Sequence, residues 1–217
     1  MKTVAIIGNG SGLYPDFTPY LDTVDCWIGA DRGAWTLVKK NIPMDYAVGD
    51  FDSTTKEERE AIAKYSKYMK EYSSEKDETD LEIALNKAFE LKPDYIYLFG
   101  VTGGRLDHEL INVQLLYSII DKGIKGAIID QTNYIELTLQ SEHHVKHDKS
   151  YPNISFVPFS HEVRGITLTN FYYPLTDANI SWGSTLCISN KLIRNSGTFS
   201  YNEGILLLIK SRDTIPR

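Results

Sequence analysis

The sequence has 217 residues, of which 42% are hydrophobic and 24% are charged, and its formal net charge at pH 7 is −6. This composition suits a compact protein with one large core or two smaller ones, and it gives no sign of an intrinsically disordered chain. The negative charge, together with the lack of a basic run interleaved with aromatic residues, argues against nucleic acid as a partner.

No apolar stretch is long enough for the core of a signal peptide or for a membrane span. Residues 4–7 are apolar, but Gly8 follows them directly. Cys26 and Cys187 each lie in an apolar segment, far from any spacing typical of metal ligands, so we expect two buried thiols. The chain is therefore predicted to be cytoplasmic and to have no contact with a membrane.

Residues 1–135 alternate short apolar runs with amphipathic helical stretches, which is the pattern of a mostly parallel sheet covered by helices. The expected strands are residues 4–7, 26–29, 46–48, 95–99 and 127–129. We predict a doubly wound α/β domain for this part of the chain.

Two helices are expected between the third and fourth strands, and the second begins at a capping box formed by Thr79 and Glu82. A further helix is expected from Leu106 to Asp121, and Gly123 marks its end. Apolar residues recur at helical spacing on one face of that helix. They are Leu110, Val113, Tyr117 and Ile120.

From residue 136 to residue 217 the helical period is absent, and short β-branched and aromatic stretches alternate with Asn, Gly and Pro turns. This change predicts a second, β-rich domain. Residues 141–150 form a polar tract with His143, His144 and His147, which we interpret as a surface hairpin or linker. A metal site in these histidines is the alternative, but no framework of carboxylates or cysteines accompanies them.

Ligands of a doubly wound sheet bind at the carboxyl ends of its strands, so the residues after each expected strand are candidates for a site. The first four expected strands are each followed by a polar, glycine-rich loop. These loops are Gly8-Asn9-Gly10, Ala30-Asp31-Arg32-Gly33, Gly49-Asp50-Phe51-Asp52-Ser53 and Gly100-Val101-Thr102-Gly103-Gly104-Arg105-Leu106-Asp107-His108. Together they predict a ligand site at one edge of the sheet.

Asp50 and Asp52 are the most specific feature of these loops. Two carboxylates one residue apart in an extended loop can point to the same side and share a cation. Mg²⁺ prefers oxygen ligands and needs only one or two carboxylates where substrate phosphates supply others. The alternative makes Asp52 a helix cap and Asp50 a turn residue. We favour the metal site because capping needs only one aspartate.

A second acidic group contains Asp77 and Asp80, at the start of the capped helix, where carboxylates also favour the positive end of the helix dipole. The neighbouring Lys76 favours their convergence on the same cleft as the first pair. The turn Thr102-Gly103-Gly104-Arg105 can bring main-chain N–H groups close to phosphate oxygens, with Arg105 as a clamp. Alone, this turn is weak evidence, because it matches neither the P-loop nor the G-x-G-x-x-G spacing.

As a set, these segments resemble the signature loops of thiamine pyrophosphokinases, in the same order and at similar spacings. The matching segments are Asp31-Arg32-Gly33, Gly49-Asp50-Phe51-Asp52-Ser53, Lys76-Asp77-Glu78-Thr79-Asp80 and Thr102-Gly103-Gly104-Arg105-Leu106-Asp107-His108. In the second half, Tyr173-Pro174-Leu175 and Ser189-Asn190 are similar to the family's thiamine-binding segments. The resemblance covers nearly the whole chain, and its acidic and Gly-Gly loops are its most specific parts.

The resemblance implies an α/β nucleotide-binding domain over residues 1–135 and a thiamine-binding β-sandwich over residues 136–217. It implies a magnesium-dependent enzyme that transfers the diphosphate group of ATP to the hydroxyethyl group of thiamine and releases AMP. It also implies a homodimer, in which each active site lies between the α/β domain of one subunit and the sandwich of its partner.

The resemblance also implies roles for individual residues. Those implied for catalysis or Mg²⁺ are Asp50, Asp52, Asp77 and Asp80, with Arg105 as a further catalytic residue. Those implied for ATP are Asp31, Arg32, Thr102, Gly103, Gly104, Arg105, Asp107 and His108. Those implied for thiamine are Tyr173, Ser189 and Asn190. Trp182 either stacks on the cationic thiazolium ring of thiamine or packs in the core.

The predicted mechanism is direct attack of the thiamine hydroxyl on the β-phosphorus, because the sequence has no evident arrangement for a covalent nucleophile. Either Asp77 or Asp80 would accept the hydroxyl proton.

Two other functions compete with this one. A phosphohydrolase is suggested by Asp50-x-Asp52, although haloacid-dehalogenase-type phosphatases carry that motif after the first strand. A non-enzymatic nucleotide or sugar sensor would not need the metal-binding carboxylates.

Overall fold

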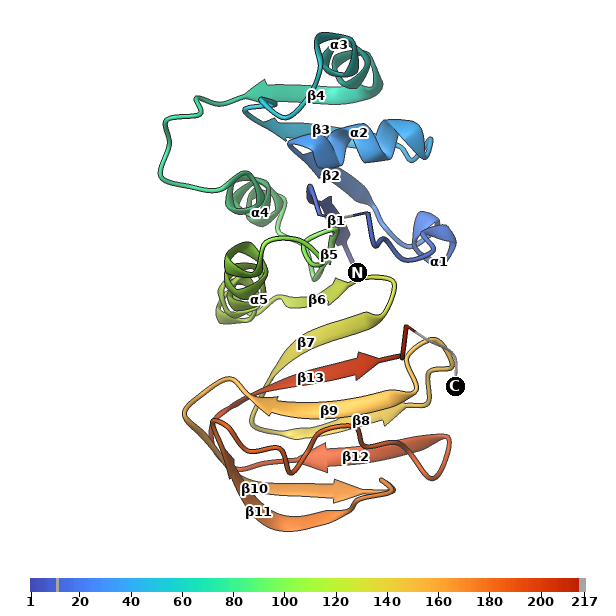
Figure 1. The fold of residues 1–217 in the computed structure, drawn as a ribbon, viewed down its shortest axis with the longest axis vertical. Coiled ribbons are helices and arrows are strands. Elements are labelled where there is room, and N and C mark those ends of the chain that lie inside the picture. Colours follow the sequence, from blue (N-terminus) through green and yellow to red (C-terminus); the bar gives the residue numbers. More distant parts are fainter. Residues whose placement is uncertain (11, 215–217) are drawn as a thin grey trace. The chain divides into compact units, whose positions relative to one another are not determined.

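The structure, a computed structural model, describes residues 1–10 and 12–214 (Figure 1). The chain divides into two compact units, Met1–Gln131 and Thr132–Arg217. This division falls shortly before residue 135, where the character of the sequence changes.

The first unit is built on a sheet of parallel strands in the order β4-β3-β2-β1-β5-β6. The strands are β1 (Thr3–Ile7), β2 (Cys26–Ala30), β3 (Met44–Gly49), β4 (Ser66–Glu71), β5 (Tyr95–Phe99) and β6 (Lys125–Ile129). Every residue of β1 and β2 is buried, so both faces of the sheet are covered. Continuous apolar runs such as 4–7 are typical of strands in this position.

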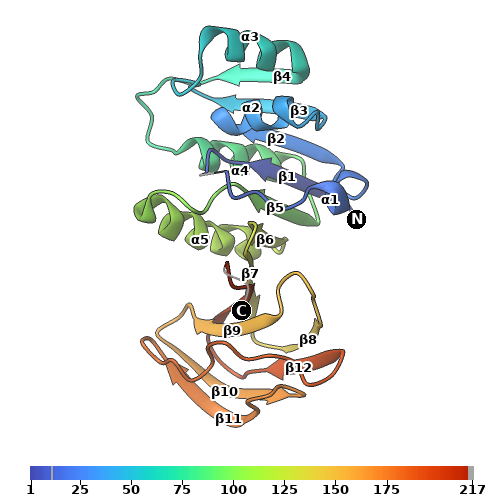
Figure 2. The ribbon, with the colours of Figure 1, turned by 45° about the vertical axis from the view of Figure 1, so that its right-hand side comes forward.

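Helices cover the two faces of this sheet. They are α1 (Thr18–Leu21), α2 (Arg32–Lys39), α3 (Lys56–Tyr65), α4 (Asp80–Glu90) and α5 (Leu106–Asp121). A Cβ atom at Gly29 would meet Ala34 of α2, and one at Gly126 would meet Ile119 of α5. The strand register puts these two glycines on opposite faces, so α2 and α5 lie on opposite sides of the sheet (Figures 1 and 2). The predicted doubly wound α/β fold is confirmed.

The strand order reverses between β1 and β5, because β1 to β4 extend the sheet in one direction and β5 and β6 extend it in the other. At such a reversal the loops that leave the two strands diverge and open a crevice. Here those loops begin with Gly8 and Gly100, whose backbones are still in contact at that point, since a Cβ atom at Gly8 would lie 2.8 Å from the Gly100 carbonyl oxygen. A Cβ atom at Gly10 would lie 2.5 Å from the Gly100 carbonyl oxygen, so a larger residue would not fit.

Two details of the first unit differ from the sequence-based expectation. Both helices expected between the strands now labelled β3 and β5 are present, as α3 and α4, but the unexpected strand β4 lies between them. In addition, α5 buries Asn112, Leu116 and Ile119, while Leu110 and Tyr117 of the predicted apolar series are 58% and 44% exposed. None of the helices in the described part of the chain is long and apolar enough to cross a membrane.

The second unit is a sandwich of two antiparallel sheets. Its strands are β7 (Asn133–Leu139), β8 (Glu142–Lys146), β9 (Asn153–Pro158), β10 (Glu162–Thr169), β11 (Leu175–Ser181), β12 (Ser196–Ser200) and β13 (Ile205–Ser211). In one sheet β13 pairs with β7 and β9, and in the other the order is β11-β10-β12-β8. Side chains of both sheets, among them Phe156, Ile166 and Phe199, form one core. The predicted C-terminal β-sandwich is confirmed.

The histidine-containing tract of residues 141–150 includes β8, an edge strand of the second sheet. The His143 ring stacks on Phe199, with the ring centroids 4.6 Å apart. Within the described residues, the three histidines of this tract do not form a group with metal-site geometry. The structure thus gives no support to the alternative of a metal site there.

Candidate active site

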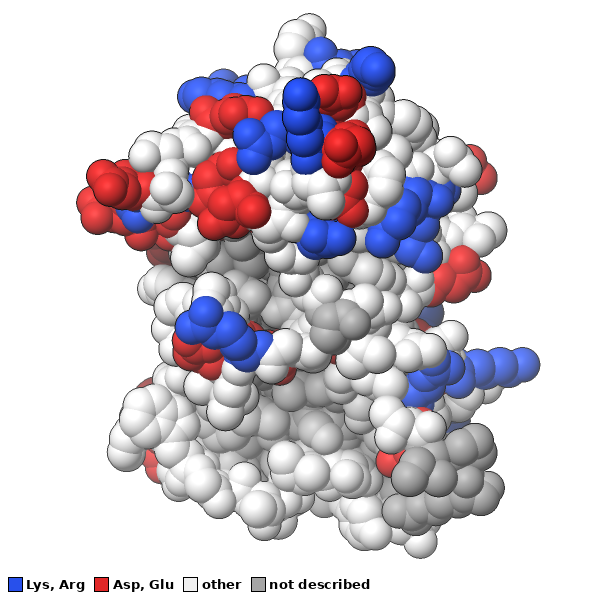
Figure 3. Space-filling model, turned by 45° about the horizontal axis from the view of Figure 1, so that its top comes forward, with Lys and Arg blue, Asp and Glu red and all other residues white. Residues whose placement is uncertain are grey.

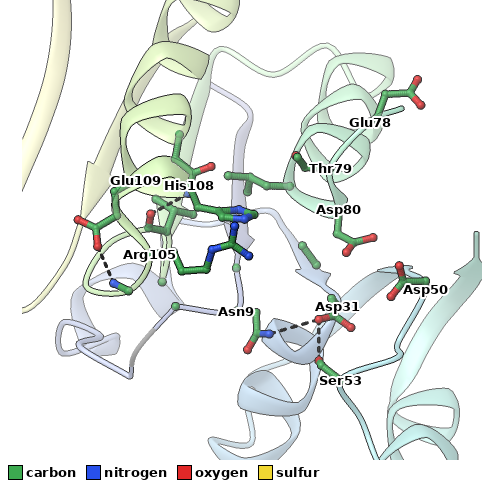
Figure 4. A pocket seen from close by; sticks show the side chains of 18 of the residues that line it. Asn9, Asp31, Asp50, Ser53, Glu78, Thr79, Asp80, Arg105, His108 and Glu109 are labelled. Atoms are coloured by element: carbon green, nitrogen blue, oxygen red, sulfur yellow. Dashed lines mark hydrogen bonds between the residues drawn. The ribbon is translucent and has the colours of Figure 1, made fainter. Parts of the chain in front are cut away.

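A cleft of about 730 Å³ opens at the carboxyl ends of the parallel strands, where the strand order reverses (Figure 4). All four polar loops that follow β1, β2, β3 and β5 contribute to its wall, and the first turns of α4 and α5 complete it. The topology of the sheet therefore brings together residues that are far apart in the sequence, such as Gly8 and Asn112.

Three aspartates gather on one side of this cleft. Asp31, Asp50 and Asp52 each offer one carboxylate oxygen, and these oxygens lie within 4.8 Å of one another. In the described part of the chain, no other group of three or more His, Cys, Asp or Glu residues has this geometry. Carboxylates that converge in this way repel one another unless a cation lies among them.

Asp31 is the most buried member of this group, with 6% of its surface exposed. Its Oδ2 accepts hydrogen bonds from the Ser53 hydroxyl (2.7 Å) and the Asn9 amide (3.3 Å), as Figure 4 shows. Its Oδ1 is buried and has no hydrogen-bond partner. A buried carboxylate oxygen without a partner is costly, so this atom is a ready ligand for a metal ion.

Lys76 neutralises part of the acidic cleft. Its Nζ lies 3.0 Å from carboxylate oxygens of both Asp50 and Asp80. Burial raises the pKa of Asp50, but hydrogen bonds from Lys76 and the Asp52 main chain outweigh it and leave that pKa below its ordinary value. For Asp80, burial prevails over the ion pair and raises the pKa. The Lys76 ammonium group thus holds together carboxylates from the β3 loop and the start of α4.

The glycine turn after β5 forms the opposite wall. The Thr102 hydroxyl donates to Asp130 (2.7 Å), a buried residue after β6, and the Gly104 N–H donates to Glu109 (2.5 Å). Arg105 forms two hydrogen bonds with Asp107, and both side chains are exposed. Figure 4 shows the Arg105 and His108 side chains extending toward the side of the cleft where Asp31 lies. The Gly104 N–H and the Arg105 guanidinium are thus occupied by carboxylates of α5 itself.

Comparison with known proteins identifies the family. The model of the thiamin pyrophosphokinase catalytic domain matches residues 17–128, and that of the thiamin pyrophosphokinase vitamin B1 binding domain matches residues 142–206. The chain belongs to the thiamin pyrophosphokinase family.

Some members of the thiamin pyrophosphokinase family resemble this chain over nearly its whole length. The thiamine pyrophosphokinase of Bacillus subtilis (strain 168) is 47% identical over 98% of this chain and 100% of its own. A crystal structure of thiamine pyrophosphokinase from Bacillus subtilis has a TM-score of 0.92 at 45% identity, covering 98% of this chain and 100% of its own. The thiamin pyrophosphokinase structure from Candida albicans, at 17% identity and a TM-score of 0.82, shares the fold over 97% of this chain and 89% of its own.

Not every residue that the family pattern suggested lies in the cleft. Asp77 is exposed and does not line it, whereas Asp80 does. Neither Asp77 nor Asp80 belongs to the group of three aspartates. The third member of that group, beside Asp50 and Asp52, is Asp31. Arg32 turns away and donates to Glu58 of α3 (3.0 Å) and to the Ser53 carbonyl, so it supports the β3 loop from behind. Gly103 and Asp107 also lie outside the lining of the cleft.

Other residues that line the cleft had no individual role predicted for them. Asn9 and Ser53 lie in two of the predicted loops and donate to Asp31, whereas Glu109, which accepts from Gly104, lies outside those loops. Asn112 lines it from α5, is 9% exposed, and donates to the Val101 carbonyl (2.8 Å). A signal for Asn112 exists in the sequence, because it stands at helical spacing from the apolar residues that α5 buries.

The thiamine-binding candidates lie in the second unit, within the segment that matches the vitamin B1 binding model. Asn190 is 2% exposed; its Oδ1 accepts from the Tyr173 N–H (3.0 Å) and its Nδ2 donates to the Tyr173 carbonyl (2.8 Å). The side chain of Asn190 therefore fixes the main chain of Tyr173. The Tyr173 and Trp182 side chains are 58% and 64% exposed, and Ser189 has a left-handed backbone with φ of 56°.

Proposed function

We propose that this protein is a thiamine pyrophosphokinase that transfers the diphosphate group of ATP to the hydroxyethyl group of thiamine, releases AMP and acts in the cytoplasm. The observation that carries the proposal is full-length similarity to a thiamine pyrophosphokinase, in a chain whose cleft gathers three aspartates opposite a glycine turn. In this proposal residues 1–135 bind ATP and residues 136–217 bind thiamine.

The carboxylates of the cleft fit Mg²⁺. They offer only oxygen atoms, they come from two adjacent loops, and Asp31 contributes a buried oxygen without a partner. We propose Asp31, Asp50 and Asp52 as the ligands; Asp80 would not contact the ion, and Lys76 would hold Asp80 beside Asp50. The bound ion would neutralise phosphate charge, and substrate oxygens would complete its coordination. Asp77, which is exposed and does not line the cleft, would only orient substrate.

The proposed reaction forms a bond between the thiamine hydroxyl oxygen and the β-phosphorus of ATP. The bond from that phosphorus to the oxygen bridging the α- and β-phosphates breaks, and AMP leaves with the electron pair. The hydroxyl proton passes to a carboxylate, for which Asp80 is better placed than Asp77 because it lines the cleft. The principal task of the protein is to position the reactants and offset their charge.

ATP would be bound through the glycine turn. Arg105 and Asp107 form an exposed ion pair, which contributes little stability, so Arg105 is free to exchange Asp107 for a phosphate. Thr102, Gly103 and Gly104 would present main-chain N–H groups to the phosphates once Glu109 leaves Gly104. His108 lies beside them at the start of α5 and is the proposed contact to the nucleoside part of ATP. Arg32 would act on ATP only through the Ser53 loop.

A homodimer is part of the proposal. The exposed apolar series on α5, including Leu106, Leu110 and Tyr117, is a face that a second subunit would cover. The exposed Tyr173 and Trp182 of the second unit are proposed to bind thiamine at the cleft of the partner subunit, with Ser189 and Asn190 beside them. Light scattering of the purified protein measures this directly, and a monomeric mass under assay conditions would contradict it.

The surface charge favours small anionic substrates over nucleic acid. On the face seen in Figure 3, Lys and Arg alternate with Asp and Glu and do not merge into a basic surface. With a net charge of −6, the chain would repel a nucleic acid backbone, whereas a polyphosphate paired with Mg²⁺ avoids this repulsion.

The proposed function is tested by incubating the protein with ATP, Mg²⁺ and thiamine. We expect AMP and thiamine diphosphate in equal amounts and no reaction with EDTA in excess over Mg²⁺. Chromatography quantifies both products. Release of ADP and phosphate without thiamine diphosphate would indicate a phosphohydrolase, and tight ATP binding without any product would indicate a sensor.

Asp31→Asn tests the metal site through stability. Without metal, we expect its free energy of unfolding to rise by about 1 kcal/mol, because the neutral amide is not repelled by the carboxylates of Asp50 and Asp52. With 10-fold or greater excess of Mg²⁺ over its Kd, the wild type should gain about 1.4 kcal/mol or more and Asp31→Asn much less. Thermal unfolding in EDTA and in Mg²⁺ measures both effects.

Ser53→Ala is the matched control for Asp31→Asn. It removes the hydroxyl that donates to Asp31 and should lower stability in EDTA, the opposite sign. An equal gain from Mg²⁺ in the wild type and in Asp31→Asn would show that Asp31 is not a ligand. An unchanged or lowered stability of Asp31→Asn in EDTA would contradict the expected repulsion among the three aspartates.

A further inference from the structure

The main chain between the two aspartates of the β3 loop has an unusual conformation. Phe51 has a φ of 55°, in the left-handed region, and its side chain is completely buried. Bulky residues rarely adopt this backbone conformation, and it persists only where surrounding groups hold it. Because Phe51 is anchored inside, the carboxylates of Asp50 and Asp52 on either side of it are directed outward to the cleft.

The carbonyl oxygen of Phe51 accepts three hydrogen bonds. Two come from the next turn of the loop, the Thr54 N–H (3.1 Å) and the Thr54 hydroxyl (2.6 Å). The third comes from Nη2 of Arg59 (2.9 Å), which lies on α3. The Arg59 bond has a charged donor and is therefore the strongest type of the three. Of these contacts, it alone connects the loop to a helix.

The helix that carries Arg59 is itself well fixed at its start. Thr55 and Glu58 form a reciprocal capping box, and Arg32 of α2 binds both Glu58 and the Ser53 carbonyl. The other partner of Arg59 is Glu71, at 3.8 Å on the surface, where an ion pair contributes little. The contact to Phe51 is therefore the one through which Arg59 can affect the cleft.

We propose that Arg59 is a positioning residue for the metal-binding aspartates, acting through the main-chain carbonyl of Phe51. The inference rests on the proposed function, because it assumes that Asp50 and Asp52 bind Mg²⁺. Carboxylates within 4.8 Å of one another repel, and a loop free to relax would separate them. Arg59 opposes that relaxation, so the ligands are already gathered before the cation arrives.

Arg59→Met tests this role with Mn²⁺ alone as the probe. Electron paramagnetic resonance should show Mn²⁺ binding weakened about tenfold, the usual effect of removing a group that orients metal ligands. The Mg²⁺ concentration for half-maximal AMP release should rise by a similar factor, with kcat at saturating Mg²⁺ within about twofold of the wild type. Arg59→Lys, which keeps a cationic donor without the fork, should give an intermediate Mn²⁺ affinity.

Glu71→Gln is the matched control, because it removes the ion-pair partner of Arg59 and leaves the contact of Arg59 with Phe51. The Mn²⁺ affinity of Glu71→Gln should equal that of the wild type.

If Arg59→Met does not fold, Thr54→Val provides a second test with the same expected result, because it removes another donor to the Phe51 carbonyl. Wild-type Mn²⁺ affinity in folded Arg59→Met, whatever its melting temperature, would overturn the inference while leaving the proposed function intact. Failure of the wild type to bind Mn²⁺ would instead contradict the proposed metal site and, with it, this role.

Discussion

Asp50→Asn is expected to lower kcat for thiamine diphosphate formation by about a thousandfold, at the upper end of what loss of a single electrostatic group costs an enzyme. Asp50 belongs to the group of three aspartates and also pairs with Lys76, so the amide removes a charged ligand and leaves Lys76 with only Asp80. The circular dichroism spectrum should be unchanged, because Asp50 lies in a loop at the cleft. AMP release under saturating ATP, thiamine and Mg²⁺ measures the effect.

Asp22→Asn is a suitable control for this experiment. Asp22 is exposed at the end of α1 and does not line the cleft, so its amide variant should keep the wild-type rate. Near-normal AMP production by Asp50→Asn would count decisively against the proposed metal site. The same expectation applies to Asp52→Asn, whose carboxylate belongs to the same group.

Gly33→Ala is expected to lower the free energy of unfolding of the first unit by about 3 kcal/mol, the upper range for overpacking a closed site. A Cβ atom at Gly33 would lie 2.0 Å from the Ile7 carbonyl oxygen and 2.9 Å from that of Gly8. Both are main-chain atoms where β1 meets α2, and they cannot move without disturbing the sheet. Calorimetry should show a melting temperature lower by about 6–12 °C.

Gly104→Ala is the control for the clash. A Cβ atom there would meet nothing within 4 Å, so its melting temperature should be that of the wild type. If Gly33→Ala melts at the wild-type temperature too, the close packing of α2 against β1 is incorrect.

The strands of the first unit were predictable where they are buried on both faces. Residues 95–99 form β5 as expected, because a strand inside a parallel sheet is an uninterrupted apolar run. Strand β4 was not predicted, because it is not buried on both faces and has no apolar run. It lies at the edge of the sheet, where only Ser66 and Met69 are partly buried, and its Lys-rich sequence shows no apolar alternation.

Helix α5 was predicted with its observed bounds, but its packing was not. Periodicity locates apolar residues on a face without saying what covers that face. In the structure Asn112 turns inward because its amide finds the Val101 carbonyl, while Leu110 stays exposed. The hydrogen bond to the loop that precedes the helix favours this orientation, and the apolar periodicity along the helix does not contain that information.

The sequence by itself determined the class of both halves, the family and the importance of Asp50 and Asp52, because these depend on residue types and spacings along the chain. Only the tertiary structure decided that Asp31 joins them, that Asp77 stays outside, and that Arg32 supports a loop. The reason is physical: ligands of one cation must lie within a few ångströms, and the order of strands in the sheet, not distance along the sequence, sets which loops meet.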